Sequence, residues 1–246
     1  MPTLIFDIET VGEQWDELDE TTQESLTRWI ERSARNEEER DARIADIKQG
    51  LGFSPLTGSV VSIAVYDRER SQGAVYYRGE GNEEEYTADG FIYKQRDEAA
   101  MLEDFWEGAR SYQIFVTFNG RAFDVPFLVH RSLAHGVTPS VNLVGRRYLS
   151  QQKVLYHVDL QDELTFYGAM QRRPNLHLFC RAYGIESPKQ GVGGDDVAAL
   201  FEGGAYQTIA EYNAADVVAT TALYERWLAH LAPPWFRADA STHYVQ

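Results

Sequence analysis

The sequence predicts an α/β domain with a mixed central sheet of five or six strands, flanked by helices. Three observations predict this class. Apolar runs typical of strands come first, amphipathic patterns typical of helices follow, and at least one strand–helix–strand crossover joins them. The chain has 246 residues, 43% of them hydrophobic, so it can bury a sizeable core. We expect one domain over residues 1–246, with a charged helical insertion at about 13–50.

The first strand is expected at residues 3–9, where the run Leu4–Ile8 is apolar apart from Asp7. Such a run is typical of a central strand that is covered on both faces. Residues 13–50 are charged and helix-forming, with apolar side chains spaced for amphipathic helices. We interpret this segment as a solvated helical pair in preference to a lid over a site. Several glycines and Pro55 then predict a loop.

The later elements are short strands and helices whose order supports the α/β class. Asn119–Gly120 predicts a turn between a strand and the helix that runs through Leu133, and Pro233–Pro234 ends the last helix. The expected strands are 59–66, 74–77 and 91–93, arranged as a meander, and 113–118. The expected helices are 97–110, 176–183, 197–201 and 206–231.

Charge and cysteine content limit the partners and the cofactors. The net charge is -15, which argues against a protein that coats long duplexes, but residues 121–190 carry nine basic and five acidic side chains. This locally basic middle suits a short nucleic-acid strand held at one site. The single cysteine, Cys180, excludes an internal disulfide and a thiolate zinc site, so oxygen or imidazole must hold any metal.

The sequence shows no membrane segment. No apolar stretch is long enough to span a bilayer, and the N-terminus lacks both a basic start and a cleavable apolar region. We therefore expect a cytoplasmic protein without a membrane partner, a monomer or a simple homo-oligomer, whose protein partners the sequence does not specify.

Asp7 and Glu9 lie two residues apart on the first strand, so their side chains leave the same face of the sheet. Two carboxylates in this position repel each other and lose hydration. The usual remedies are protonation or a bound cation. The alternative is an exposed strand end that happens to be acidic.

Three further residues are candidates for the same site. Asp124 follows the strand at 113–118 and begins a helix, where the alternative role is an N-cap. Tyr212 and Asp216 lie four residues apart on the last helix and therefore share a face. The alternative is that they lie, as such residues commonly do, at the surface and at the edge of the core.

Together these residues resemble the three exonuclease motifs of the DEDD superfamily. The motifs are Asp7-Ile8-Glu9-Thr10, Asn119-Gly120 with Phe123-Asp124-x-Pro126-Phe127-Leu128, and Tyr212-x-x-x-Asp216. Tyr212 places the chain in the tyrosine branch, since Glu211 stands where the other branch has histidine. From Pro2 to about Trp227 the chain most resembles the predicted 3′-5′ exonucleases related to the proofreading domain of family B DNA polymerases. The resemblance implies a ribonuclease H-like (DnaQ-like exonuclease) fold.

The resemblance also implies the chemistry: hydrolysis of single-stranded nucleic acid, DNA favoured, from the 3′ end to nucleoside 5′-monophosphates. Phosphodiester cleavage needs charge neutralised on the attacking and leaving oxygens, which two divalent cations about 4 Å apart provide, and oxygen ligands suit Mg²⁺ or Mn²⁺. By resemblance, Asp7 bridges both metals and Asp124 serves the second. Glu9 and Asp216 complete the site that activates water, and the Tyr212 hydroxyl orients that water.

Substrate contacts are expected at Asn119, Phe123 and Arg131. Phe123 offers a face for stacking a base, with core packing as its rival, while Asn119 equally fits a turn. Arg131 would follow a phosphate, with solvated surface as the alternative. Asp159 fits a helix cap, and the glycine-rich 191–194 fits a flexible turn better than a phosphate nest. Two alternatives stay open for the whole chain: an RNA or oligoribonucleotide exonuclease with the same site, or a catalytically silent nucleic-acid-binding module.

Overall fold

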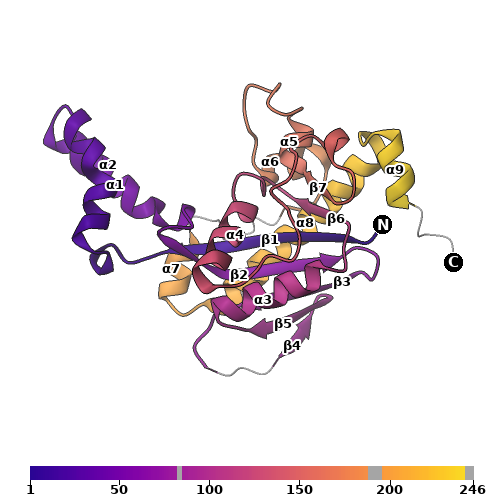
Figure 1. The fold of residues 1–246 in the computed structure, drawn as a ribbon, viewed down its shortest axis with the longest axis horizontal. Coiled ribbons are helices and arrows are strands. Elements are labelled where there is room, and N and C mark those ends of the chain that lie inside the picture. The colour runs from indigo at the N-terminus through magenta and orange to yellow at the C-terminus, as the bar shows by residue number, and fades with distance from the viewer. Residues whose placement is uncertain (82–84, 188–195, 242–246) are drawn as a thin grey trace.

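A computed structural model describes residues 1–81, 85–187 and 196–241. They form a mixed seven-stranded sheet with the strand order β4-β5-β3-β2-β1-β6-β7, covered by helices (Figure 1). The strands are β1 (Thr3–Gly12), β2 (Gly58–Asp67), β3 (Gln72–Tyr77), β4 (Tyr86–Ala88), β5 (Phe91–Gln95), β6 (Ile114–Thr117) and β7 (Tyr156–Asp159). The α-helices are α1 (Glu20–Ser33), α2 (Glu37–Gly50), α3 (Glu98–Ala109), α4 (Asp124–His135), α5 (Leu160–Leu164), α6 (Leu176–Tyr183), α7 (Val197–Glu202), α8 (Tyr206–His230) and α9 (Pro234–Ser241).

The first strand is central, as its apolar run predicts. β1 pairs antiparallel with β2 and parallel with β6, and Ile5 and Phe6 are fully buried on its two faces. It continues to Gly12, beyond the predicted end at Glu9, because a bulge between Glu9 and Thr10 lets its pairing with β2 resume. The acidic residues therefore lie in the middle of a strand.

Helices cover both faces of the sheet. The long helix α8 packs on one face, where Val217, Tyr224 and Trp227 join the core cluster that contains Ile5. Helices α3 and α4 cover the other face, where Trp106 belongs to the cluster that contains Phe6. Burial of large side chains on both faces fixes where α8 crosses β1, and this crossing positions the site described below.

The expectation of five or six strands is wrong, because the sheet has seven. The sequence did not predict the short strands β4 and β7. β7 was missed because Tyr156-His157-Val158-Asp159 carries polar residues at buried positions and forms no apolar run. The meander is also wrong at its third strand, since β5 runs parallel to β3 and pairs antiparallel with β4. The sequence also did not predict helix α9, which follows Pro233.

The segment at 13–50 forms two helices that project beyond one end of the sheet (Figure 1). Asp19 and Asn36 cap α1 and α2 through their side chains. Only Ile30 of α1 is buried, and α2 has no buried residue, which agrees with a solvated helical pair. At the base of the pair, Gly12 and Gly52 approach so closely that a Cβ on either would lie within 3 Å of the other's backbone nitrogen.

His157 links β7 to the rest of the fold as a neutral side chain. Its Nδ1 lies 3.2 Å from the Leu143 carbonyl oxygen and therefore carries the proton and donates it in a hydrogen bond, while Nε2 accepts a hydrogen bond of 2.9 Å from the Thr117 hydroxyl. Burial, together with the nearby charge of Arg121, lowers the pKa of His157 to about 3.

This burial predicts a loss of stability in acid. Below a pH of about 6.5, which is the pKa of a histidine in the unfolded chain, the unfolded protein binds a proton that folded His157 does not, so stability is lost as the pH falls from about 6.5 toward about 3. Between about pH 7 and pH 4.5, we expect wild type to lose roughly 2.5 kcal/mol more in urea unfolding than His157→Asn, whose amide can still donate to Leu143. Equal losses in the two proteins would contradict a neutral buried imidazole.

Among the described residues, none of the helices has the length and apolar character needed to cross a membrane. Lys189, one of the nine basic residues of the segment 121–190, and the glycine-rich 191–194 lie outside the described residues.

Candidate active site

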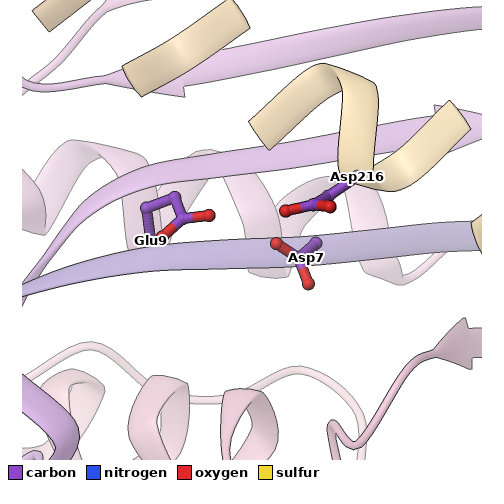
Figure 2. A group of neighbouring side chains, drawn as sticks. All are labelled: Asp7, Glu9 and Asp216. Carbon is purple, nitrogen blue, oxygen red and sulfur yellow. The ribbon is translucent and has the colours of Figure 1, made fainter. Parts of the chain in front are cut away.

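Three carboxylates converge where α8 crosses β1. Asp7 and Glu9 leave the same face of β1, and Asp216 comes down from α8, so that the three side chains border one small space (Figure 2). One oxygen atom from each lies within 4.8 Å of the others, and all three residues are half-buried. The structure therefore brings together residues that are more than 200 positions apart in the chain.

Asp124 lies next to this group, at the first residue of α4. It is 3% exposed, and its Oδ1 accepts a hydrogen bond of 3.1 Å from the backbone N–H of Ile8. That N–H is available because the pairing of β1 with β6 ends at Ile5. Phe123 holds the N-cap position of α4, so the alternative of Asp124 as an N-cap is wrong; its carboxylate instead binds the acidic strand.

Burial and mutual repulsion raise the pKa values of the clustered carboxylates. The pKa of Asp7 is raised well above its usual value, first by burial and then by the charges of Asp124, Asp216 and Glu9. Burial, then repulsion from Asp216 and Asp124, raises the pKa of Glu9. Burial raises that of Asp124 to about 7. An all-oxygen donor set with uncompensated negative charge fits a hard divalent cation such as Mg²⁺ or Mn²⁺.

Tyr212 lies one turn before Asp216 and is hydrogen-bonded to its carboxylate. Burial raises the pKa of Tyr212, and the charges of Asp216 and Glu9 raise it further. The phenol therefore stays protonated at neutral pH and can act only as a hydrogen-bond donor or acceptor. It is suited to orient a molecule rather than to remove a proton.

Asn213 is a residue of the site that sequence reasoning missed. It is fully buried, and its Nδ2 donates to Asp7 Oδ2 over 3.5 Å. Its Oδ1 is buried and without a hydrogen-bond partner among the described residues. The available signal was a polar amide at a position of α8 whose neighbours Ala210, Ala214 and Val217 are core.

A pocket of about 250 Å³ opens beside the carboxylates. It is lined by Asp7, Tyr212 and Asp216, and also by Asn119, as the sequence predicts for a substrate contact. His177 lines it as well, although its spacing from other histidines gave no signal.

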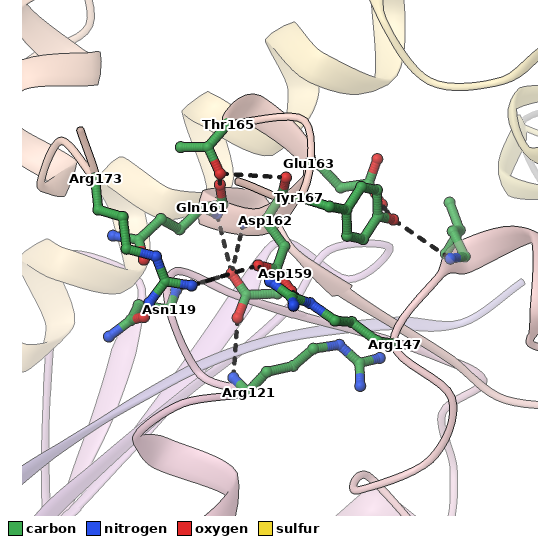
Figure 3. Close-up of polar contacts among 11 residues, drawn as sticks. Asn119, Arg121, Arg147, Asp159, Gln161, Asp162, Glu163, Thr165, Tyr167 and Arg173 are labelled. Atoms are coloured by element: carbon green, nitrogen blue, oxygen red, sulfur yellow. Dashed lines mark hydrogen bonds and ion pairs between the residues drawn. The ribbon is translucent and has the colours of Figure 1, made fainter. Parts of the chain in front are cut away.

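Asp159, at the end of β7, holds the turn that carries Asn119. Its carboxylate accepts the backbone N–H groups of Asn119 at 3.0 Å and Arg121 at 2.9 Å, and it also caps α5, as its sequence position predicts (Figure 3). Asn119 has φ +65°, and a Cβ at Gly120 would meet Thr117 at 2.4 Å, so this turn needs its Asn-Gly sequence.

Aromatic side chains lie next to Asp124 in the chain and pack against one another. Phe123 is half-buried and tilted against the buried Phe127, with ring centroids 5.5 Å apart. Its other neighbour is Phe53, which is 63% exposed and lies edge-on at 6.4 Å. Phe53 was not considered from the sequence, because it follows the helical insertion and is distant from every motif.

Arg131 is committed to a buried carboxylate. Its Nε and one terminal nitrogen donate to Glu98 at 2.8 and 2.7 Å, and Glu98 is only 7% exposed. The structure therefore gives Arg131 a role in packing α4 against α3, and we leave it out of the proposed substrate contacts.

A family model matches most of the chain. The family model described as "Predicted 3'-5' exonuclease related to the exonuclease domain of PolB" matches residues 59–232, which include Asp124, Tyr212 and Asp216. Asp7 and Glu9 precede the match, but the fold brings them to Asp216. No curated protein matches the chain.

A solved structure shows a similar fold. The family B DNA polymerase from the hyperthermophilic archaeon Pyrobaculum calidifontis superposes with a TM-score of 0.56 and 19% sequence identity. The match covers 92% of this chain and 24% of that chain, so this chain spans about a quarter of the polymerase. The likeness establishes the α/β, ribonuclease H-like fold that the motifs predict.

Proposed function

The chain belongs to the family of predicted 3′-5′ exonucleases related to the exonuclease domain of PolB, and on this premise we propose that it hydrolyses single-stranded nucleic acid, DNA in preference to RNA, from the 3′ end. The products would be nucleoside 5′-monophosphates. The observation that carries the proposal is the approach of Asp7, Glu9 and Asp216 within 4.8 Å, with Asp124 beside them.

The four carboxylates are assigned as metal ligands. As the resemblance implies, Asp7 would be a ligand of both ions, with Glu9 and Asp216 completing one position and Asp124 the other. When bound there, two Mg²⁺ or Mn²⁺ ions would lower the pKa of a water molecule and neutralise charge on the leaving 3′ oxygen. Asn213 holds Asp7 in its orientation through the amide donor, which favours the ionised carboxylate.

Tyr212 is assigned to orient the attacking water. Its hydroxyl is held by Asp216, so its direction is set before substrate arrives. A water that donates to a carboxylate and contacts this hydroxyl would be positioned for attack on the phosphorus, which is a matter of positioning rather than of proton removal.

The substrate is assigned to the pocket beside the carboxylates. Asn119 lines this pocket and would hydrogen-bond near the scissile phosphate. Phe123 and the exposed Phe53 present faces and edges on which a terminal base can stack, an interaction worth about 1 to 3 kcal/mol per base. Because stacking does not depend on base identity, little sequence preference is expected.

The direct test of this function uses two matched oligonucleotides that differ only at the 3′ end. With Mn²⁺, we expect mononucleotides to be released from an oligothymidylate with a free 3′ hydroxyl and none from one with a blocked 3′ end. Addition of EDTA should stop release. Equal cleavage of both substrates would indicate an endonuclease, and cleavage of neither, under conditions where the oligonucleotide binds, would indicate a silent binding module.

The same assay distinguishes DNA from RNA. A 2′-hydroxyl at the 3′ end changes one or two contacts, so competition between matched DNA and RNA ends measures the preference directly. Faster release from DNA supports the proposal, and faster release from RNA reassigns the substrate without changing the site.

A further inference from the structure

Two pockets with basic linings lie next to the acidic pocket, on the side of β6 and β7. The first has a volume of about 360 Å³ and is lined by Arg121, Arg147 and Arg173, together with Asp159 and Asp162. The second, also about 360 Å³, is lined by Arg121, Arg146 and Lys153, and its described lining contains no acidic residue. We call Arg121, Arg146, Arg147, Lys153 and Arg173 the basic track.

The acidic pocket and the two basic pockets adjoin one another, because they share lining residues. Asn119 borders both the acidic pocket and the first basic pocket. Arg121 and Gly145 border both basic pockets. The turn after β6, which Asp159 fixes through two backbone hydrogen bonds, therefore connects the three.

The first basic pocket keeps an excess of positive charge. Arg147 donates to Asp162 at 2.8 and 2.5 Å, and Arg173 lies 3.7 Å from the same carboxylate (Figure 3). One carboxylate thus faces two guanidinium groups. Asp159 adds a second negative charge, but the lining has three guanidinium groups against these two carboxylates, so one positive charge remains in excess.

The second basic pocket has cations without acidic partners. The Arg121 guanidinium donates only to carbonyl oxygens, those of Gly145 at 3.3 Å and His157 at 3.0 Å, and no described carboxylate lies within 4.0 Å of it. Burial lowers the pKa of Arg121, and the opposing charges of Asp159 and Asp162 do not outweigh it. Arg146 and Lys153 are exposed and form no ion pair among the described residues.

We propose that the basic track binds phosphates of the substrate strand upstream of its 3′-terminal nucleotide, so that the strand leaves the acidic site past Asn119 and across the ends of β6 and β7. This rests on the proposed function, to which it adds the path of the strand. The chain carries a net charge of -15, so most of its surface repels an anionic strand. The local excess of positive charge beside the acidic pocket is therefore where such a strand would bind most favourably.

The test compares the double variant Arg146→Ala/Lys153→Ala with the matched control Arg110→Ala/Arg226→Ala. Both remove two exposed cations, but the control positions lie at the end of α3 and late in α8 and line neither basic pocket. The substrates are a thymidine dinucleotide and an oligothymidylate of roughly twelve nucleotides, a length that covers a typical single-strand site.

With the longer substrate, we expect kcat/KM of the track variant to fall about fivefold or more, since each lost phosphate contact removes counterion release, whereas the dinucleotide is affected less than about twofold. In fluorescence anisotropy with the labelled longer strand in EDTA, the plot of log affinity against log salt should become shallower by about 1.4, or about 0.7 per contact. The control variant should match wild type in both measurements.

The outcomes separate the two proposals. If wild type cleaves the strand and the track variant matches the control with both substrates, the track is wrong and the nuclease assignment stands. If wild type binds but does not cleave and the track variant alone loses binding, the strand path stands and the nuclease assignment fails. A loss that is equal for the dinucleotide and the longer strand would also overturn the track, because it would indicate an effect on the acidic site.

Discussion

Asp7→Ala is expected to abolish divalent-dependent release of nucleotides while the protein remains folded. The charges of Glu9, Asp124 and Asp216 all act on Asp7, and the proposal makes Asp7 a ligand common to both metal positions, which its loss removes. Charge stabilisation by such metals is worth several kcal/mol, so the rate should fall by about a thousandfold or more. The measurement is the initial rate with Mn²⁺ on the oligothymidylate, beside the urea unfolding curve.

Tyr212→Phe is the matched comparison for this variant. It keeps all four carboxylates and removes only the hydroxyl bound to Asp216. We expect Mn²⁺ to bind as in wild type while turnover falls roughly ten- to a hundredfold, as for a positioning group. Retained turnover in Asp7→Ala would contradict the site. A Tyr212→Phe protein that no longer binds Mn²⁺ would show that the hydroxyl maintains the metal ligands.

Glu98→Ala is expected to lower the free energy of unfolding by about 3 to 5 kcal/mol, because it leaves charged and polar partners buried without a counterpart. Glu98 accepts two hydrogen bonds from Arg131, one of 2.7 Å from the Val60 N–H, and contacts His135 Nε2 at 2.7 Å. Burial acts to raise the pKa of Glu98, but the bonds from Arg131 and Val60 outweigh it and lower that pKa.

Glu103→Ala, on the same helix, is the control for this prediction. Glu103 is exposed, so its replacement should change the unfolding free energy by less than about 0.5 kcal/mol. If Glu98→Ala cost no more than the control, the ion pair would be energetically unimportant, and Arg131 would again be available to bind a phosphate.

The sequence indicated the acids that the structure brings together because their signal is local. Asp7 and Glu9 are two apart on an apolar run, which fixes their common face, and Tyr212 and Asp216 are one helical turn apart. Whether these pairs meet depends on how α8 crosses β1, and burial of Val217 and Trp227 against the sheet decides that crossing. From the sequence, only the order of the exonuclease-like motifs predicted that the two pairs meet.

What the sequence did not reveal is set by contacts between distant segments. Arg131 looked like a free surface cation because nothing in its neighbourhood signals Glu98, 33 residues earlier. Strand β7 lacked an apolar run because His157 and Asp159 are buried polar residues that bind Thr117 and the turn at Asn119. Phe53 reaches Phe123 only because Gly12 and Gly52 let the insertion close onto β1.

The most direct measurement is the anomalous scattering of a crystal soaked in Mn²⁺ at a concentration that supports turnover. An ion bound by oxygens of Asp7, Glu9 and Asp216, with a second toward Asp124, is the predicted result. A map with manganese only at other positions, or with none while nucleotide release continues, would contradict the account.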